Sequence, residues 1–133
     1  MNMPTINVTP TMLEYLKTKG ITDKELILIT DDAGGKYSLN GGSCSLGANF
    51  TIIVLDQPDP DYQLKMENNA DLHMWTSKYD TMFFESGLTL DYKNHSVEIR
   101  DNAHILDNAV QIANGQEVLN AAGKGMQASG GNC

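Results

Sequence analysis

The chain has 133 residues, of which 41% are hydrophobic and 20% are charged. That length suits a single domain with enough apolar residues to build a core, which excludes a chain that is disordered by default. Nine Lys and Arg side chains against 17 Asp and Glu side chains give a net charge of −8. Such an acidic domain is a poor ligand for nucleic acid or for an anionic membrane surface. No apolar run approaches the ~20 residues of a membrane-spanning helix, and the first residues lack a signal-peptide pattern. We therefore expect a cytoplasmic protein.

The first half of the sequence predicts one helix followed by buried strands. Thr9 is a favourable N-cap, Pro10 suits the first helical position, and Gly20 provides a stop, so a helix is expected between them. Glu25–Thr30 is a continuous apolar run, which indicates a strand buried on both faces. Asn49–Leu55 has the strongest strand pattern in the chain.

The second half predicts further strands and one short helix. Two prolines in the segment 57–61 exclude a helix there, whereas Ser77–Ser86 begins with a possible N-cap and precedes a glycine. The remaining strands are expected over Tyr62–Met66, Asp71–Trp75, Leu88–Tyr92, Ser96–Arg100 and Ile105–Ala113. Because strands outnumber helices and do not alternate with them, the pattern favours a mainly β fold, compact and antiparallel, with an N-terminal helix and a second short helix.

The last residues differ in composition from the rest of the chain. The segment 115–133 is rich in glycine and contains no aromatic residue, although Val118 and Leu119 could start one helical turn. We expect one domain over residues 1–114, followed by a flexible Gly-rich tail over residues 115–133.

The two cysteines, Cys44 and Cys133, are too few for a disulfide framework. In the cytosol both would stay reduced, as buried apolar side chains, reactive thiolates or metal ligands. Cys44 lies in the loop Gly41-Gly42-Ser43-Cys44-Ser45-Leu46-Gly47, at the entrance to a strong strand. The backbone of a glycine-rich loop can approach a ligand closely, and its amides can favour a thiolate. A small residue in an ordinary turn is the alternative interpretation.

Two segments together carry a family resemblance. The first is the Cys44 loop followed by the hydrophobic strand that ends at Asp56, and the second is Phe84-Glu85-Ser86-Gly87-Leu88-Thr89-Leu90-Asp91-Tyr92. With the capped N-terminal helix, these segments resemble the HesB-like, A-type family of iron–sulfur cluster assembly proteins, over about Ile6 to Asn114. The resemblance implies a compact, mainly β fold, often oligomeric, that holds or passes iron or Fe–S clusters through three cysteines.

The resemblance assigns the loop cysteine of the family to Cys44. The other two family cysteines form a Cys-Gly-Cys near the C-terminus, which is absent after Asn114, so Cys133 is the remaining candidate ligand. The loop here is also one residue longer than the family pattern. An Fe–S cluster usually takes four thiolates, which a homodimer could supply from Cys44 and Cys133 of both chains.

Other motifs offer weaker candidates. His73, His95 and His104 have no spacing typical of a zinc site. The carboxylates of the proline-containing loop are expected to form a solvated acidic turn. There is no phosphate-binding glycine motif and no nucleophile elbow, so we do not expect an enzyme.

Three hypotheses follow. The first is an accessory protein of iron–sulfur cluster assembly that binds iron or a cluster through Cys44 and Cys133, with assembly proteins or apo-protein recipients as partners. The second is a metal-free member of the family that acts as a protein-interaction module. The third is a redox-sensing thiol at Cys44.

Overall fold

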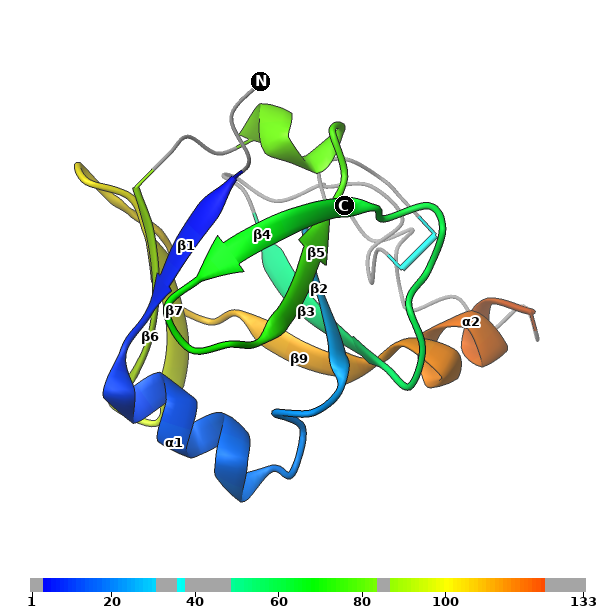
Figure 1. Cartoon of the computed structure of the whole chain (residues 1–133), viewed down its shortest axis with the longest axis horizontal. Helices are drawn as coiled ribbons and strands as arrows, with labels where there is room; N and C mark the ends of the chain where they lie inside the picture. Colours follow the sequence, from blue (N-terminus) through cyan, green and yellow to red (C-terminus); the bar gives the residue numbers. More distant parts are fainter. Residues whose placement is uncertain (1–3, 31–35, 38–48, 84–86, 124–133) are drawn as a thin grey trace, which may run out of the picture.

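The computed structural model of the chain describes residues 4–30, 36–37, 49–83 and 87–123. These residues form nine strands, two α-helices and one 3-10 helix (Figure 1). The helices are α1 (Pro10–Thr18), α2 (Gly115–Gly123) and the 3-10 helix η2 (Asp80–Phe83). The strands are β1 (Thr5–Val8), β2 (Glu25–Thr30), β3 (Phe50–Leu55), β4 (Leu64–Asn68), β5 (His73–Thr76), β6 (Leu88–Lys93), β7 (Ser96–Arg100), β8 (Ile105–Asp107) and β9 (Gln111–Asn114).

The nine strands form one sheet that curls back on itself. Its order is β8-β7-β6-β1-β4-β5-β2-β3-β9, so the two edge strands are consecutive in the chain. The short link from β8 to β9 therefore joins opposite edges of the sheet (Figure 1). At this seam the Val110 amide donates a hydrogen bond to the Val97 carbonyl of β7 at 3.0 Å.

The mainly β fold is confirmed, but the strand pairing is more mixed than the antiparallel expectation. Among the described strands, four pairs are antiparallel and four are parallel. Two of the four parallel pairs involve β1, a four-residue strand where the sequence predicts no element before the helix. β1 inserts between β4 and β6 and runs parallel to both.

The helix α1 begins as its sequence predicts. Thr9 is the N-cap, and its Oγ1 accepts a hydrogen bond from the Met12 amide at 3.2 Å, while Pro10 opens the first turn. Such a cap satisfies an amide that has no partner within the helix. Met12 and Leu16 are fully buried, and they anchor the helix on the interior of the curled sheet.

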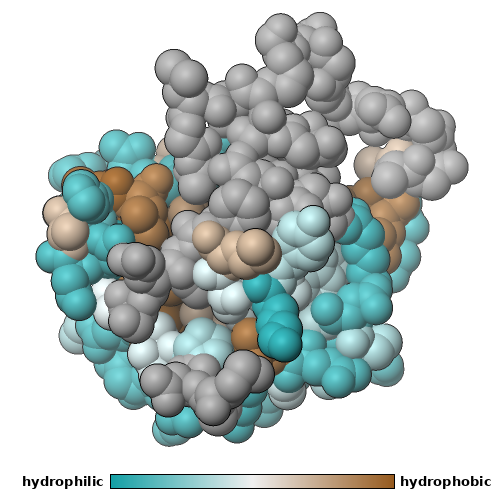
Figure 2. Space-filling model, turned by 90° about the horizontal axis from the view of Figure 1, so that it is seen from above, coloured by the Kyte–Doolittle hydropathy of each residue, from teal (hydrophilic) through white to brown (hydrophobic). Residues whose placement is uncertain are grey.

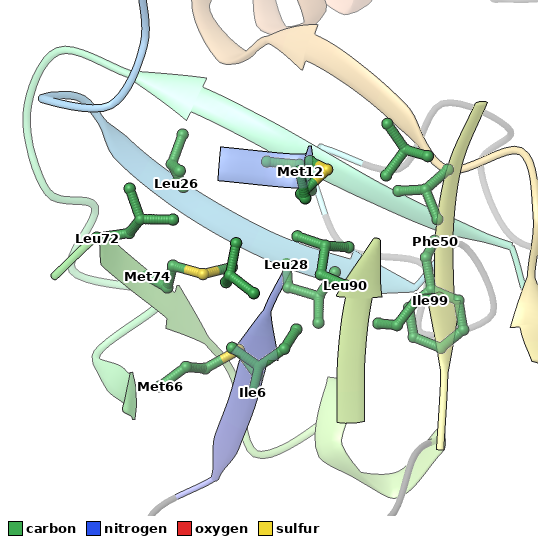
Figure 3. Close-up of a cluster of buried hydrophobic side chains, with 14 of the residues drawn as sticks. Ile6, Met12, Leu26, Leu28, Phe50, Met66, Leu72, Met74, Leu90 and Ile99 are labelled. Atoms are coloured by element: carbon green, nitrogen blue, oxygen red, sulfur yellow. The ribbon is translucent and has the colours of Figure 1, made fainter. Parts of the chain in front are cut away.

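The main core fills the inside of the curled sheet. Its members come mainly from α1 and from the strands β1 to β7. Figure 3 shows several of these side chains directed toward one another. Fully buried members with no measurable exposure include Met12, Leu16, Leu26, Leu28, Ile52, Met66, Met74, Leu90 and Ile99.

A second apolar cluster covers the opposite face of β2 and β3. Ile27, Ile29 and Ile53 point to this face, where Tyr37 and Tyr62 pack on them together with Val118 and Leu119 of α2. The strand β2 is therefore buried on both faces, which confirms the prediction from the continuous apolar run Glu25–Thr30.

Three predicted elements differ from the structure. A 3-10 helix over Asp80–Phe83 replaces the start of the helix predicted from Ser77, and residues 84–86 lie outside the described part. The predicted strand Ile105–Ala113 is divided into β8 and β9, because the chain crosses the seam between them.

The third difference is α2, which occupies Gly115–Gly123, where the sequence predicts a flexible tail. The Asn114 side chain caps it by accepting a hydrogen bond from the Glu117 amide at 3.0 Å, and two apolar residues of α2 pack on the second cluster. Residues 124–133, the rest of the predicted tail, lie outside the described residues. In the described part of the chain, no helix combines the length and apolarity needed to cross a membrane.

Candidate functional site

Both predicted metal ligands, Cys44 and Cys133, lie outside the described residues. The structure does describe residues that flank the Cys44 loop on both sides. Three points define these surroundings: Thr30 at the end of β2, the dipeptide Lys36-Tyr37, and Phe50 at the start of β3. An aspartate side chain accepts a hydrogen bond at each of these three points.

The first carboxylate is Asp80, which is 3% exposed and fixes the end of β2. Its Oδ1 accepts hydrogen bonds from the amide of Thr30 at 2.9 Å and from the Thr30 hydroxyl at 3.2 Å. Its Oδ2 accepts a hydrogen bond from the Ser77 hydroxyl at 2.5 Å. A buried carboxylate needs such donors to offset the loss of hydration. The end of β2 is therefore tied to the segment that opens η2.

The second carboxylate, Asp59, holds Tyr37 and Lys36. The Tyr37 hydroxyl donates to Asp59 Oδ2 at 2.5 Å, and the Tyr37 side chain is only 2% exposed. Lys36 Nζ lies 2.8 Å from Asp59 Oδ2 and 2.9 Å from Asp61 Oδ2. The expectation of a purely solvated acidic turn is therefore wrong for Asp59, whose side chain is 7% exposed.

The ionisation of these groups follows from their contacts. Burial, reinforced by the hydrogen bond to Asp59, holds the pKa of Tyr37 well above its usual range. Burial alone would raise the pKa of Asp59, but the hydrogen bonds from Lys36, Tyr37 and the Asp61 amide lower it below its usual range. Burial would lower the pKa of Lys36, yet its two carboxylate partners raise it. At neutral pH Tyr37 is thus a neutral phenol, Lys36 an ammonium and Asp59 a carboxylate.

The third carboxylate, Asp107 at the end of β8, holds the start of β3. Its Oδ2 accepts a hydrogen bond from the Phe50 amide at 2.8 Å. Its Oδ1 accepts one from the Ala109 amide at 2.8 Å, which fixes the turn that leads to β9. The strand that follows the Cys44 loop is therefore anchored across the seam of the sheet.

A surface hollow of about 390 Å³ adjoins the Asp59 cluster. It lies between the proline-containing loop, the end of β3 and the beginning of α2. Its polar lining includes Lys36 from the dipeptide Lys36-Tyr37, together with Asp56, Asp59, Asn114 and Gln116 from these three segments and the residues next to them.

The segment Leu90-Asp91-Tyr92, which carries much of the family resemblance, stabilises the scaffold. Asp91 Oδ1 accepts hydrogen bonds from the hydroxyls of Thr9 at 2.7 Å and Thr11 at 3.0 Å. Its Oδ2 accepts one from Arg100 Nη1 at 3.1 Å. These bonds lower the pKa of Asp91 to about 2, with the Thr9 hydroxyl as the largest cause. Asp91 therefore joins the N-terminus of α1 to β6 and β7.

Tyr92 extends this junction along the helix. Its ring stacks on that of Tyr15 in α1, with ring centroids 3.9 Å apart and planes 8° from parallel. Stacked aromatic pairs add to the burial energy of the two rings. No group of three His, Cys, Asp or Glu side chains within the described ranges is arranged to hold a metal ion.

The surface is largely hydrophilic where the structure describes it. Figure 2 shows hydrophilic residues over most of the described surface of one face, with hydrophobic residues in separate groups. The large hydrophobic side chains exposed among the described residues are Tyr79, Met82 and Ile105.

Comparison with known proteins gives consistent results. The family model described as iron–sulphur cluster biosynthesis matches residues 4–114. A crystal structure of a protein assigned to Fe–S biosynthesis from Lactobacillus acidophilus is 38% identical, with a TM-score of 0.79. That match covers 90% of this chain and 97% of the other. A second crystal structure, from Lactobacillus salivarius, is 22% identical over 84% of this chain and 98% of the other. Its TM-score of 0.63 shows a shared fold. A comparison with curated proteins finds no match. The chain belongs to the iron–sulphur cluster biosynthesis family.

Proposed function

We propose that the protein is an accessory factor of iron–sulfur cluster assembly that binds iron or a cluster through the Cys44 thiolate. Cys133 is the second candidate ligand, since it is the other cysteine of the chain. The protein would accept its cargo from an assembly protein and release it to an apo-protein, without catalysing a reaction of its own. Iron and sulfide are then cargo that passes through the site.

Membership in the family is the observation that carries this proposal. The family match spans residues 4–114, which contain Cys44 and both segments of the resemblance. The three carboxylate anchors add physical support, because ligand-binding loops work best when a rigid scaffold positions their ends. Asp80, Asp59 and Asp107 fix described residues on both sides of the Cys44 loop.

The number of cysteines sets the expected stoichiometry. Fe–S clusters usually take four thiolates, and one chain has two cysteines. Two chains would supply four, so a cluster ligated only by cysteine requires a homodimer around a shared axis. Iron alone, or a cluster completed by a ligand from a partner, would allow a monomer.

Anaerobic reconstitution with ferrous iron and sulfide tests the proposal. We expect sulfur-to-iron charge-transfer bands in the visible spectrum of the full chain, and a loss of these bands in Cys44→Ala. Cys133→Ala separates the two ligands, because a weaker band with altered stoichiometry is expected if Cys133 contributes. Ser45→Ala, next to Cys44, is the matched control and should leave the spectrum unchanged. Sedimentation of the loaded protein then gives the number of chains per cluster.

The other outcomes identify the alternative hypotheses. If iron and sulfide produce no bands in the wild-type chain, the carrier proposal is wrong and the metal-free interaction module is favoured. A Cys44 thiol that titrates well below ~8.5 and forms a sulfenic acid with peroxide, without binding iron, identifies a redox sensor instead.

A further inference from the structure

The seam of the curled sheet opens into a groove beside β9. After the hydrogen bond from Val110 to Val97, the chain leaves β7 and pairs with β3 instead. Two adjoining hollows of about 250 and 460 Å³ follow this departure and share Lys19 and Ile112. We define the seam groove by the residues that line them: Tyr15, Thr18, Lys19, Ile21, Val54, His95, Ser96, Val97, Ala109, Val110, Ile112, Ala113 and Asn114.

One wall of the seam groove is the open edge of β9. In the described sheet β9 pairs with β3 alone and is the last strand in the order. The Val110 amide points away from β3, toward β7. Val110 immediately precedes β9 and main-chain groups alternate along an extended chain, so we infer that the N–H and C=O of Ile112 point to the same side as the Val110 amide. They therefore face the groove, where an added strand could pair with them.

The other wall carries one cationic side chain, that of Lys19. Lys19, at the C-terminal end of α1, lines both hollows, and His95 lines one of them. The Lys19 ammonium lies 5.1 Å from the centre of the Tyr15 ring and forms no ion pair within the described part of the chain. None of the described residues that line the two hollows is Asp or Glu, although the chain has 17 of them.

We propose that the seam groove binds a short, extended, acidic segment of a partner protein. The segment adds as a strand at the edge of β9 and pairs with the main chain of Ile112, while one of its carboxylates meets Lys19. Apolar side chains of the segment face Ile21 and Ile112 on the floor of the groove. This mode combines main-chain pairing for affinity with charge and apolar pockets for selectivity. It does not depend on metal binding by Cys44.

Two features of the groove determine the kind of occupant. β9 has four residues, so it can pair with only a short segment, and the expected complex is weak and reversible. The surrounding protein has a net charge of −8, so an acidic partner would be repelled over most of the surface and attracted at Lys19. A second copy of this chain would bring its whole net charge of −8 to the groove, whereas a short segment brings only a few carboxylates.

The test uses the full chain and a fluorescein-labelled peptide of alternating Val and Glu residues, read by fluorescence anisotropy at physiological salt, where a Debye length of about 8 Å screens the repulsion from distant carboxylates. A peptide of alternating Val and Gln residues has the same strand pattern without charge. We expect the acidic peptide to bind and Lys19→Glu to weaken its binding about tenfold. Lys65→Glu, which makes the same charge change at an exposed position on β4, should have little effect. Ile112→Pro removes the groove-facing amide at an edge strand and should also weaken binding.

Amide hydrogen exchange gives a second measurement that does not require the Pro variant to fold. Binding of the acidic peptide should slow exchange of the Ile112 amide. Equal binding by wild type and Lys19→Glu, equal binding of the two peptides, or no binding would each overturn the proposal. So would slow exchange of Ile112 in the chain alone, because the groove would then be filled by a second copy or by residues 124–133.

Discussion

Replacing Asp91 with asparagine should destabilise the protein in a manner that depends strongly on pH. The Asp91 carboxylate accepts hydrogen bonds from the hydroxyls of Thr9 and Thr11 and from Arg100. The asparagine side chain would keep one acceptor oxygen but lose the charge, and its NH₂ group would compete with these donors. The Asp91 side chain is 14% exposed, so solvent screens these interactions only partly.

The magnitude follows from the pKa of Asp91. A fall from the ordinary 3.8 to about 2, at ~1.36 kcal/mol per pKa unit, gives roughly 2.4 kcal/mol of stability at neutral pH. Because the folded-state pKa is depressed, this contribution is complete well above pH 3.8 and is lost as the pH falls toward 2. Linkage gives about half of it at pH 3.

Urea denaturation followed by circular dichroism, at pH 7, 5, 4 and 3, measures the difference between wild type and Asp91→Asn. We expect a lower free energy of unfolding for the variant, by about 2 kcal/mol at pH 7 and about 1 kcal/mol at pH 3. Asp71→Asn removes an exposed carboxylate and serves as the control. A difference that stays constant from pH 7 to pH 3 would refute the assignment of the stability to the charged form of Asp91.

Two further substitutions test the anchors around the candidate site. Tyr37→Phe removes the hydrogen bond to Asp59 while keeping the ring on the second cluster, and should lower the free energy of unfolding by about 1–2 kcal/mol in urea. No change would mean that Lys36 and the Asp61 amide are sufficient to hold Asp59. Gly115→Ala places a Cβ against the Leu55 side chain and 2.8 Å from Ile53 Cγ2, so it should cost about 1–3 kcal/mol by thermal denaturation. A neutral Gly115→Ala would show that α2 can shift away from β3.

The elements that could be predicted from the sequence are those with local determinants. The N-cap at Thr9 and the proline that follows it set the start of α1 through contacts within one turn. The uninterrupted apolar run of β2 requires burial on both faces, whichever elements supply the cover. Neither feature depends on a distant residue, and both are confirmed.

The features that escaped prediction depend on residues far apart in the chain. The parallel pairing of β1 with β4 joins Thr5 to Glu67, and no local pattern in a four-residue strand specifies such a partner. The helix α2 begins and ends at a glycine within a glycine-rich segment, and its Val118 and Leu119 side chains pack on β2 and β3. Tertiary packing thus determines a helix where composition indicates a tail.

The candidate site shows the same difference between local patterns and contacts over long sequence separations. A cysteine loop and a family motif are local patterns, and they make Cys44 a candidate ligand from the sequence alone. The carboxylates that anchor the loop ends cannot be recognised from local sequence. Asp59, Asp80 and Asp107 accept hydrogen bonds from residues that lie 22, 50 and 57 positions away, respectively. Asp91 is recognisable within a motif, yet its contacts assign it to the scaffold and not to metal chemistry.

The acidic residues therefore have two physical roles in this protein. Part of it is structural, since Asp59, Asp80, Asp91 and Asp107 accept hydrogen bonds from amides, hydroxyls and cationic side chains. The 17 acidic side chains against nine basic ones also give the molecule a net charge of −8, which repels acidic partners. Against that background, a groove whose described lining includes Lys19 and no carboxylate is an electrostatic exception. The contrast between the groove and the rest of the surface, more than the charge of Lys19 alone, is what would direct an acidic strand to β9.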